Sequence, residues 1–342
     1  MSESTAAGLK TFLATAFHAR AELLARLAEE STDCYRLFHG SVEGVSGLTV
    51  DRYGDLLLIQ SFHHTLTAPE LSELSDFYAR HLPGLTPVYN DRSQGNSRIA
   101  NALTEEAAAL AQAPRIGTEL GIRYRIQARH AGQDPWLFLD MRAGRRRIQQ
   151  DAPGKSVLNL FAYTCGIGIA AAKAGASFVM NIDFSDSSLL VGRDNARLNE
   201  LAVRPRFIKS DAFAALRQLS GIGQPERVRG KRMPHFPRLE PRQFDLVFLD
   251  PPRYAKSPFG VVDLINDYPA VFKPALLCTA PGGRLYCCNN VAAVERELWL
   301  DQLRRSAQKA GRPIRDFTWI APEADFPSPD GKPPLKILAL EV

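Results

Sequence analysis

Apolar and polar positions follow three different patterns along the 342-residue chain. Residues 6–30 repeat apolar side chains at helical spacing with charges between them, which predicts one packing helix. After this segment the pattern changes to short strand-like runs separated by glycine turns, and later to short apolar runs that alternate with amphipathic stretches. We therefore predict an N-terminal helix (1–30), a small α/β domain (31–132) and a larger α/β domain (133–342).

The larger domain has the pattern of alternating strands and helices. Helical stretches separate most of its apolar runs, which favours a doubly wound, mostly parallel sheet. In such sheets ligands bind beyond the carboxyl ends of the strands, so functional residues are expected directly after these runs. The predicted strands are 156–161, 178–183, 207–211, 244–250, 283–289 and 335–342.

The fourth of these strands ends in Asp-Pro-Pro-Arg-Tyr at residues 250–254. Pro251 and Pro252 lack the N–H group that a sheet ladder needs, and Pro251 disfavours helical geometry at Asp250, so the strand stops there. A stiff turn at this edge can present carbonyl acceptors and the ring face of Tyr254 to a flat heteroaromatic amine. The pattern favours an enzyme that acts on a nucleobase.

Glycines and acids follow the first three strands of the larger domain. Gly166 and Gly168 lie after the first strand, where the missing Cβ would let a ligand approach the backbone. Asp183 ends the second strand, where an acid can accept from both ribose hydroxyls, and Asp211 ends the third, where it can accept from an adenine amino group. Each residue alone is equally typical of a turn or a helix cap. Together with Asp250 they are much more specific for a cofactor site.

Composition excludes several classes of protein. With 45% hydrophobic residues the chain can bury a normal core, yet no apolar run approaches the length of a membrane span. The first residues lack the basic start and apolar centre of a signal peptide. Five cysteines show neither a Cys-x-x-Cys pair nor the spacing of metal ligands. We expect a cytoplasmic protein that binds no metal.

Charge is unevenly distributed along the chain. Residues 1–120 hold 9 Lys and Arg against 15 Asp and Glu, whereas residues 121–342 hold 33 against 22. A basic carboxyl part favours a polyanionic partner such as RNA. Within it, residues 221–243 have six cations, two acids and four prolines, a composition that cannot form a core. This segment fits either a mobile basic loop that clamps RNA phosphates or a disordered insertion.

The order of glycine loop, Asp183, Asp211 and Asp-Pro-Pro resembles class I S-adenosylmethionine (SAM)-dependent methyltransferases. The missing third glycine and the Asp-Pro-Pro turn argue against a nicotinamide dehydrogenase. Roughly residues 30–342 resemble 23S rRNA methyltransferases, namely the RlmI-like cytosine-C5 enzymes and the guanine-N7 half of the bifunctional RlmK/L protein. The stretches that carry the resemblance are Cys34-Tyr-Arg-Leu-Phe, Val50-Asp-Arg-Tyr-Gly-Asp, Phe138-Leu-Asp-Met-Arg-Ala-Gly-Arg-Arg, Leu158-Asn-Leu-Phe-Ala-Tyr-Thr and Asp250-Pro-Pro-Arg-Tyr.

The resemblance implies a Rossmann-like catalytic domain with a mostly parallel seven-stranded sheet, preceded by a smaller α/β domain. It implies SAM as methyl donor and a base of large-subunit rRNA as acceptor. The cytosine-C5 members usually begin with a PUA RNA-binding domain. Only the helix of residues 6–30 stands in that place here, so we expect this domain to be absent. The oligomeric state stays open. The residues that it assigns to the cofactor are Phe161, Tyr163, Gly166, Gly168, Asp183, Phe184, Asp211 and Asp250.

The acceptor atom depends on the residues after the fifth strand. Cytosine C5 reacts only after a cysteine thiolate adds to the ring, and the position of that cysteine in the C5 relatives falls on Asn290. Cys287 and Cys288 come earlier, inside the strand, where neighbouring side chains point to opposite faces. Guanine N7 already has a lone pair and needs mainly positioning. The pattern Gly-Gly-x-x-x-x-x-Asn-Asn resembles the guanine-N7 enzyme.

We therefore favour guanine N7 as the acceptor. Asp250 and the backbone of Pro251 and Pro252 are expected to orient the base, Tyr254 to stack on it, and Asn290 to contact its edge. If the alignment with the C5 relatives is shifted by two residues, the strand-five Cys288 takes the position of the nucleophile of a C5 enzyme. Two other classes stay open, a methyltransferase for protein or small-molecule substrates and an RNA-binding protein that does not catalyse.

Overall fold

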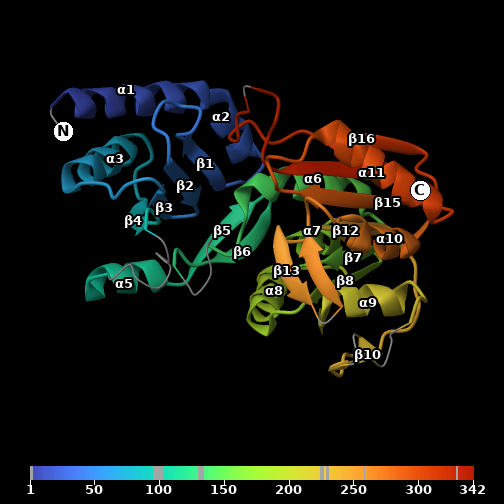
Figure 1. Ribbon diagram of the computed structural model, residues 1–342. Helices are drawn as coiled ribbons and strands as arrows, with labels where there is room; N and C mark the ends of the chain where they lie inside the picture. Colours follow the sequence, from blue (N-terminus) through green and yellow to red (C-terminus); the bar gives the residue numbers. More distant parts are fainter. Residues whose placement is uncertain are drawn as a thin grey trace. The chain divides into compact units, whose positions relative to one another are not determined.

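The computed structural model describes residues 3–94, 103–129, 135–223, 227–228, 231–257, 259–328 and 330–342. The chain forms two compact units, coloured along the sequence in Figure 1. The first unit comprises Met1–Arg142 and Glu323–Gly331, and the second comprises Ala143–Pro322 and Lys332–Val342. A short segment near the carboxyl terminus therefore belongs to the first unit. The two units meet in the sequence at Arg142 and Ala143, so the predicted domain boundary at residue 133 lies earlier in the chain.

The first unit is built on a four-stranded sheet with the order β1-β2-β3-β4. Three antiparallel strands are followed by helix α3, which returns the chain so that β4 pairs parallel to β3. Helix α3 begins with a capping box between Thr67 and Glu70, which satisfies backbone groups at its first turn. The elements of this unit are α1 (Glu3–Ala19), α2 (Ala21–Glu29), β1 (Cys34–His39), β2 (Leu48–Tyr53), β3 (Leu56–Ser61), α3 (Ala68–His81), β4 (Thr86–Asp91), α5 (Glu105–Gln112), β5 (Arg115–Glu119), β6 (Ile122–Ile126) and the 3₁₀ turn η1 (Leu139–Met141).

The segment predicted as one N-terminal helix is divided into α1 and α2 at Arg20. The backbone of Arg20 departs from helical geometry, with φ −95° and ψ 1°. Its guanidinium is buried and donates to the carbonyl oxygens of Ala16 and Arg36 and to the carboxylate of Glu43. Sequence periodicity does not detect this break because it depends on partners that lie later in the chain.

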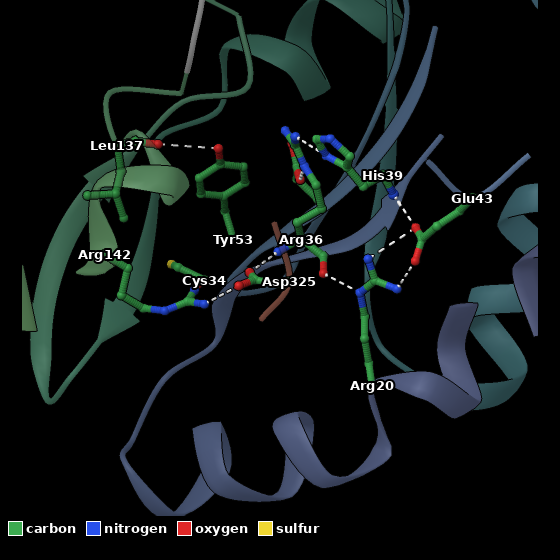
Figure 2. A network of polar contacts seen from close by, with 10 residues as sticks. Arg20, Cys34, Arg36, His39, Glu43, Tyr53, Leu137, Arg142 and Asp325 are labelled. Carbon is green, nitrogen blue, oxygen red and sulfur yellow. Dashed lines mark hydrogen bonds and ion pairs between the residues drawn. The ribbon is translucent and has the colours of Figure 1, made fainter. Parts of the chain in front are cut away.

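A buried polar network joins the segment 323–331 to β1. Figure 2 shows the guanidinium of Arg142 at the carboxylate of Asp325, and both side chains are fully buried. Arg142 also donates to the carbonyl oxygen of Cys34 at 3.0 Å, and Asp325 accepts from the backbone N–H of Arg36 at 2.9 Å. Buried charges require such pairing and hydrogen bonding, so this network ties the returning segment to the first unit.

The second unit is built on a seven-stranded sheet with the order β16-β17-β15-β12-β7-β8-β9. The five neighbouring strands from β15 to β9 pair in parallel, and β17 pairs antiparallel to both β15 and β16, so β16 runs in the same direction as the five. This confirms the predicted mostly parallel, Rossmann-like sheet. The strands are β7 (Ser156–Leu160), β8 (Phe178–Asp183), β9 (Arg206–Lys209), β12 (Phe244–Leu249), β15 (Thr279–Asn289), β16 (Asp316–Ile320) and β17 (Lys336–Glu341).

Helices and two small hairpins complete the second unit. The central strands β7 and β12 are almost entirely buried, as their continuous apolar runs require. One face of the sheet packs Leu160, Leu249 and Leu338 against Phe272 of α10 and Trp299 of α11. The remaining elements are α6 (Arg142–Asp151), α7 (Gly166–Lys173), α8 (Asp186–Leu198), α9 (Ala212–Leu219), β10 (Arg227–Val228), β11 (Lys231–Arg232), β13 (Tyr254–Ser257), β14 (Gly260–Asp263), α10 (Pro269–Leu277) and α11 (Arg296–Lys309).

Candidate active site

The register of the parallel strands brings the predicted site residues to one edge of the sheet. Leu249 of β12 pairs with Leu160 of β7 on one side and with Cys287 of β15 on the other. Leu160 pairs in turn with Ile182 of β8. The residues that follow this row therefore emerge at a common carboxyl edge. They include Phe161, Asp183, Asp250 and the end of β15.

The loop between β7 and α7 has a strained backbone. Phe161, Tyr163 and Cys165 have positive φ angles of 54°, 48° and 64°, a region that side-chain-bearing residues rarely adopt. Each such residue costs on the order of 1–3 kcal/mol, so neighbouring contacts have to hold the loop. The N–H of Ala162 donates to Ile182 O at 3.0 Å, and the N–H of Tyr163 donates to the carboxylate of Asp183 at 2.8 Å.

The two loop glycines have different surroundings. A Cβ on Gly166 would make only ordinary contacts, the nearest being 3.5 Å from Cδ of Arg145. A Cβ on Gly168 would lie 1.9 Å from Oδ1 of Asn181, inside the sheet. Close packing of α7 on β8 therefore requires glycine at 168, whereas the sequence argument attributed both glycines to a ligand. Gly166 remains the position where a ligand could approach the backbone.

Asp183 lies at the end of β8 and is 7% exposed. Its two carboxylate oxygens accept from the N–H groups of Tyr163 and Ser185, both at 2.8 Å. Burial raises the pKa of the Asp183 carboxyl, and these N–H groups oppose the rise. The adjacent Phe184 ring is 67% exposed. This pair can hold an adenosine, because the carboxylate oxygens have lone pairs for ribose hydroxyls and the ring offers a face for stacking.

Asp211 serves as the N-cap of α9. Its Oδ1 accepts from the N–H of Ala214 at 3.1 Å, which satisfies one of the free donors of the first turn. The preceding residue, Ser210, donates its N–H to Asp183 O at 3.0 Å. Asp211 therefore follows the same carboxyl edge as Asp183, and it combines a capping role with a position beyond strand β9.

The Asp250-Pro-Pro turn leads into a hairpin that the sequence did not indicate. Strand β12 ends at Leu249, and β13 begins at Tyr254 and pairs antiparallel with β14. Asp250 is half-buried and Pro251 is buried, whereas the Tyr254 side chain is 60% exposed. An exposed aromatic ring directly after this turn is available for stacking on a flat ligand.

The end of β15 separates buried residues from one exposed amide. Cys287 and Cys288 are both fully buried, and burial raises the pKa of the Cys287 thiol well above its ordinary range. Asn289 is buried as well; its side chain accepts from the N–H of Val291 and donates to the carbonyl oxygen of Leu264. The following residue, Asn290, is exposed. The two adjacent asparagines therefore have different environments, which their sequence did not distinguish.

The basic segment 221–243 is only partly among the described residues, because 224–226 and 229–230 lie outside them. Its described part contains the short hairpin β10–β11. The following residues are anchored on α9: Leu239 N–H donates to Gln218 Oε1 at 3.0 Å, and Arg242 N–H donates to Leu219 O at 2.9 Å. These contacts join the carboxyl part of the segment to α9, and the carbonyl of Leu219 at the end of that helix gains a partner. The two alternatives predicted for the segment, a mobile basic loop and a disordered insertion, stay predictions.

Sequence reasoning missed one side chain beside the glycine loop. Arg145 is 3% exposed, and its guanidinium lies 3.6 Å from the point that a Cβ on Gly166 would occupy. In the sequence it is part of the stretch 138–146 that carries the family resemblance, with no role of its own. The available signal was its helical spacing, because Arg145 lies three residues before the fully buried Ile148 and therefore on the same face.

Comparison with known proteins supports the cofactor that these residues fit. The family model for S-adenosylmethionine-dependent methyltransferases matches residues 112–339. Ribosomal RNA large subunit methyltransferase I of Aeromonas salmonicida is 30% identical over 300 residues, which cover 86% of this chain and 70% of that protein. Ribosomal RNA large subunit methyltransferase K/L of Pseudomonas paraeruginosa is 30% identical over 276 residues, which cover 78% of this chain but 34% of that protein.

Two solved structures share the fold. SMU.776, solved in complex with SAH, superposes with a TM-score of 0.74 at 19% identity, covering 98% of this chain and 82% of that one. The SAM-dependent methyltransferase from Agrobacterium tumefaciens has a TM-score of 0.56 at 17% identity, covering 86% and 87% of the two chains. Among the described residues, no helix is both long and apolar enough to cross a membrane. The chain belongs to the S-adenosylmethionine-dependent methyltransferase family, and SAM is its methyl donor.

Proposed function

We propose that this protein methylates a base of large-subunit ribosomal RNA and that the acceptor atom is guanine N7. The names of the relatives from Aeromonas salmonicida and Pseudomonas paraeruginosa support the RNA class. The basic balance of residues 121–342 supports a polyanionic substrate. The two relatives are named as different enzymes, so the choice of acceptor atom rests on the residues at the end of β15.

The observation that carries the choice is the contrast between the β15 cysteines and Asn290. A C5 enzyme needs a thiolate that can reach the base, yet Cys287 and Cys288 are fully buried within the sheet. Guanine N7 carries its own lone pair, so an exposed amide at this edge is sufficient to position the base. Asn290 is exposed and directly follows β15. Strand β15 pairs with β12, and Asp250 begins the turn that follows β12.

On the cofactor side we propose that Phe161, Tyr163, Gly166, Gly168, Asp183, Phe184, Asp211 and Asp250 form the SAM site. When bound, SAM supplies an electrophilic methyl group on a sulfonium. Asp183 holds the ribose hydroxyls, Phe184 and Asp211 contact the adenine, and the backbone at Gly166 approaches the donor closely. Gly168 acts indirectly by allowing α7 to pack on β8. The strained loop is thereby fixed in advance, which reduces the ordering cost of binding.

On the acceptor side we propose that the base lies flat against the Asp250-Pro-Pro turn. Tyr254 stacks on its face, the stiff backbone at Pro251 and Pro252 fixes its plane, and Asn290 contacts its edge. No residue has to remove a proton before N7 attacks, because the lone pair is free at neutral pH. Catalysis then consists mainly of holding N7 in line with the donor methyl group and excluding water.

Nucleoside mass spectrometry tests this function. Large-subunit rRNA is incubated with isotopically labelled SAM and the wild-type protein or the Cys287→Ala, Cys288→Ala and Asn290→Ala variants. We expect label in 7-methylguanosine, near wild-type rates for both cysteine variants, and a large loss for Asn290→Ala.

Other outcomes of the same experiment distinguish the alternatives. Label in 5-methylcytidine that disappears in one cysteine variant, with the fold intact, would establish the C5 chemistry instead. If calorimetry shows that SAM binds and yet no RNA is labelled, the substrate is a protein or a small molecule.

A further inference from the structure

A cavity of about 550 Å³ lies beside β9, the edge strand of the seven-stranded sheet. Its walls come from the carboxyl half of α8, the connection 199–205 and β9 itself. Among the described residues that line it, none belongs to the proposed SAM or base site. The cavity is therefore a separate feature of the second unit that the methyl-transfer chemistry does not explain.

Four arginines line this cavity in two pairs. Arg193 and Arg197 are four residues apart on α8 and so project from the same face of the helix. Arg204 and Arg206 flank Pro205 at the start of β9, both exposed. Side chains alternate along β9, so Phe207 faces Arg193 of α8, whereas Arg206 lies on the other face of the sheet, where its guanidinium packs on Phe178.

Acidic residues neutralise little of this charge. Arg197 pairs with Asp194 at 2.9 Å, but this pair is on the surface, where such contacts are weak. Arg193 lies with its guanidinium 5.6 Å from the centroid of Phe207, a contact that orients the cation without cancelling it. The rim of the cavity therefore attracts anions.

Apolar residues also line the cavity. They are Leu201, Val203, Phe207 and Ile208, and all four are half-buried. A cavity lined by both arginines and apolar residues suits a ligand that has both a phosphate and a flat hydrophobic ring. A single-stranded nucleotide has these two parts, because its phosphate binds arginine and its unstacked base packs on an apolar surface.

One aromatic ring outside the cavity links Arg206 to the basic segment 221–243. The ring of Phe178 lies 4.9 Å from the guanidinium of Arg206 and 3.8 Å from that of Arg242. A cation that lines the cavity and a cation of the segment therefore share a contact at this edge of the sheet.

We propose that this cavity binds a single-stranded nucleotide of the substrate RNA other than the nucleotide that is methylated. The inference rests on the proposed RNA substrate, and it adds a second contact site to it. The competing explanation is that the arginines only protect an exposed sheet edge from pairing with other chains. Charged residues that only protect a sheet edge need no cavity with apolar lining. An acidic peptide would use the arginines but has no base to pack on the apolar residues.

The test compares the double variant Arg204→Gln/Arg206→Gln with a matched control, Arg305→Gln/Lys309→Gln. The control removes two exposed cations from α11, a helix that does not line the cavity. Binding to a single-stranded large-subunit rRNA fragment is measured by fluorescence anisotropy over a series of salt concentrations. Circular dichroism and SAM calorimetry verify that each variant folds and retains the cofactor.

We expect the cavity variant to bind RNA roughly tenfold more weakly and to lose about 1.4 from the slope of log affinity against log salt, as two phosphate contacts predict. The charge-preserving variant Arg204→Lys/Arg206→Lys should keep the wild-type slope. SAM affinity should not change. If the cavity variant is misfolded, Arg197→Gln removes a surface cation of the same cavity and replaces it in the comparison, with the lysine variant as its charge-preserving reference.

The results that overturn the inference differ from those that overturn the proposed function. If wild-type protein binds and methylates rRNA while the cavity variant behaves like the control, the cavity does not bind RNA. Equal losses in the cavity variant and the control also overturn it, because they reflect only net charge. If wild-type protein neither binds nor methylates any rRNA, both proposals fail, and an acidic protein partner becomes the remaining occupant to test.

Discussion

Replacing each loop glycine by alanine separates packing from ligand approach. A Cβ at Gly168 would lie 1.9 Å from Oδ1 and 2.7 Å from Cγ of Asn181, so the asparagine side chain has to move. That side chain is fully buried, and its Oδ1 accepts from Nδ2 of Asn159 at 2.9 Å. A Cβ at Gly166 meets only Arg145, at an ordinary contact distance of 3.5 Å.

The magnitude follows from these contacts. Overpacking the interface between α7 and β8 costs about 1–3 kcal/mol. Breaking the bond between Asn159 and Asn181 leaves a buried amide without its partner, which costs about 1–3 kcal/mol more. Alanine recovers up to about 1 kcal/mol of helix propensity. Gly168→Ala should therefore lower the free energy of unfolding by about 3 kcal/mol, whereas Gly166→Ala should change it by less than about 1 kcal/mol.

Urea unfolding followed by circular dichroism measures the stability of both variants, and calorimetry measures their SAM affinity. We expect Gly166→Ala to keep its stability and to bind SAM roughly tenfold more weakly, because the added methyl group occupies space beside the loop. The double variant Gly168→Ala/Asn181→Ala should be more stable than the two single losses predict, since the obstructing atoms are gone. If Gly168→Ala unfolds with the same free energy as the wild type, the packing explanation is wrong.

Three further predictions concern other parts of the molecule. The N–H and hydroxyl of Ser156 donate to Asp245 and hold the pKa of that carboxyl below its ordinary value of 3.8. Its contribution to stability is therefore present above pH 3.8 and is lost as the pH falls through the lowered pKa, so in acid titrations of unfolding the deficit of Asp245→Ala should shrink as the pH falls below 3.8. Asp325→Ala should destabilise the first unit by about 3–5 kcal/mol in thermal unfolding, because the buried guanidinium of Arg142 loses its fully buried carboxylate and keeps only Glu323, at 3.7 Å, and the carbonyl oxygen of Cys34. A loss under about 1 kcal/mol would contradict this role. Asn290→Ala should lower kcat for RNA methylation with little change in SAM affinity, and an unchanged kcat would remove this residue from the base site.

Much of the second unit could be predicted from local sequence. Continuous apolar runs indicated the buried strands, and the alternation with helices indicated their parallel pairing, because crossovers between parallel strands need a helix. The prolines at 251 and 252 determined where β12 stops, since neither can donate to a ladder. From the parallel pairing and the stop after β12, the sequence predicts that the candidate site lies at the carboxyl edge of the sheet.

Only the tertiary structure decided how individual residues at that edge are used. The adjacent Asn289 and Asn290 are chemically identical, and the fold buries one against Leu264 and exposes the other. Gly168 is required by an asparagine on a neighbouring strand, and α1 ends at Ala19, directly before Arg20, whose guanidinium binds partners later in the chain. Strand periodicity and proline stops depend on neighbours within a few residues, and so the sequence alone determines them. Burial, pairing partners and steric limits depend on atoms from distant segments, and these meet only when the chain has folded.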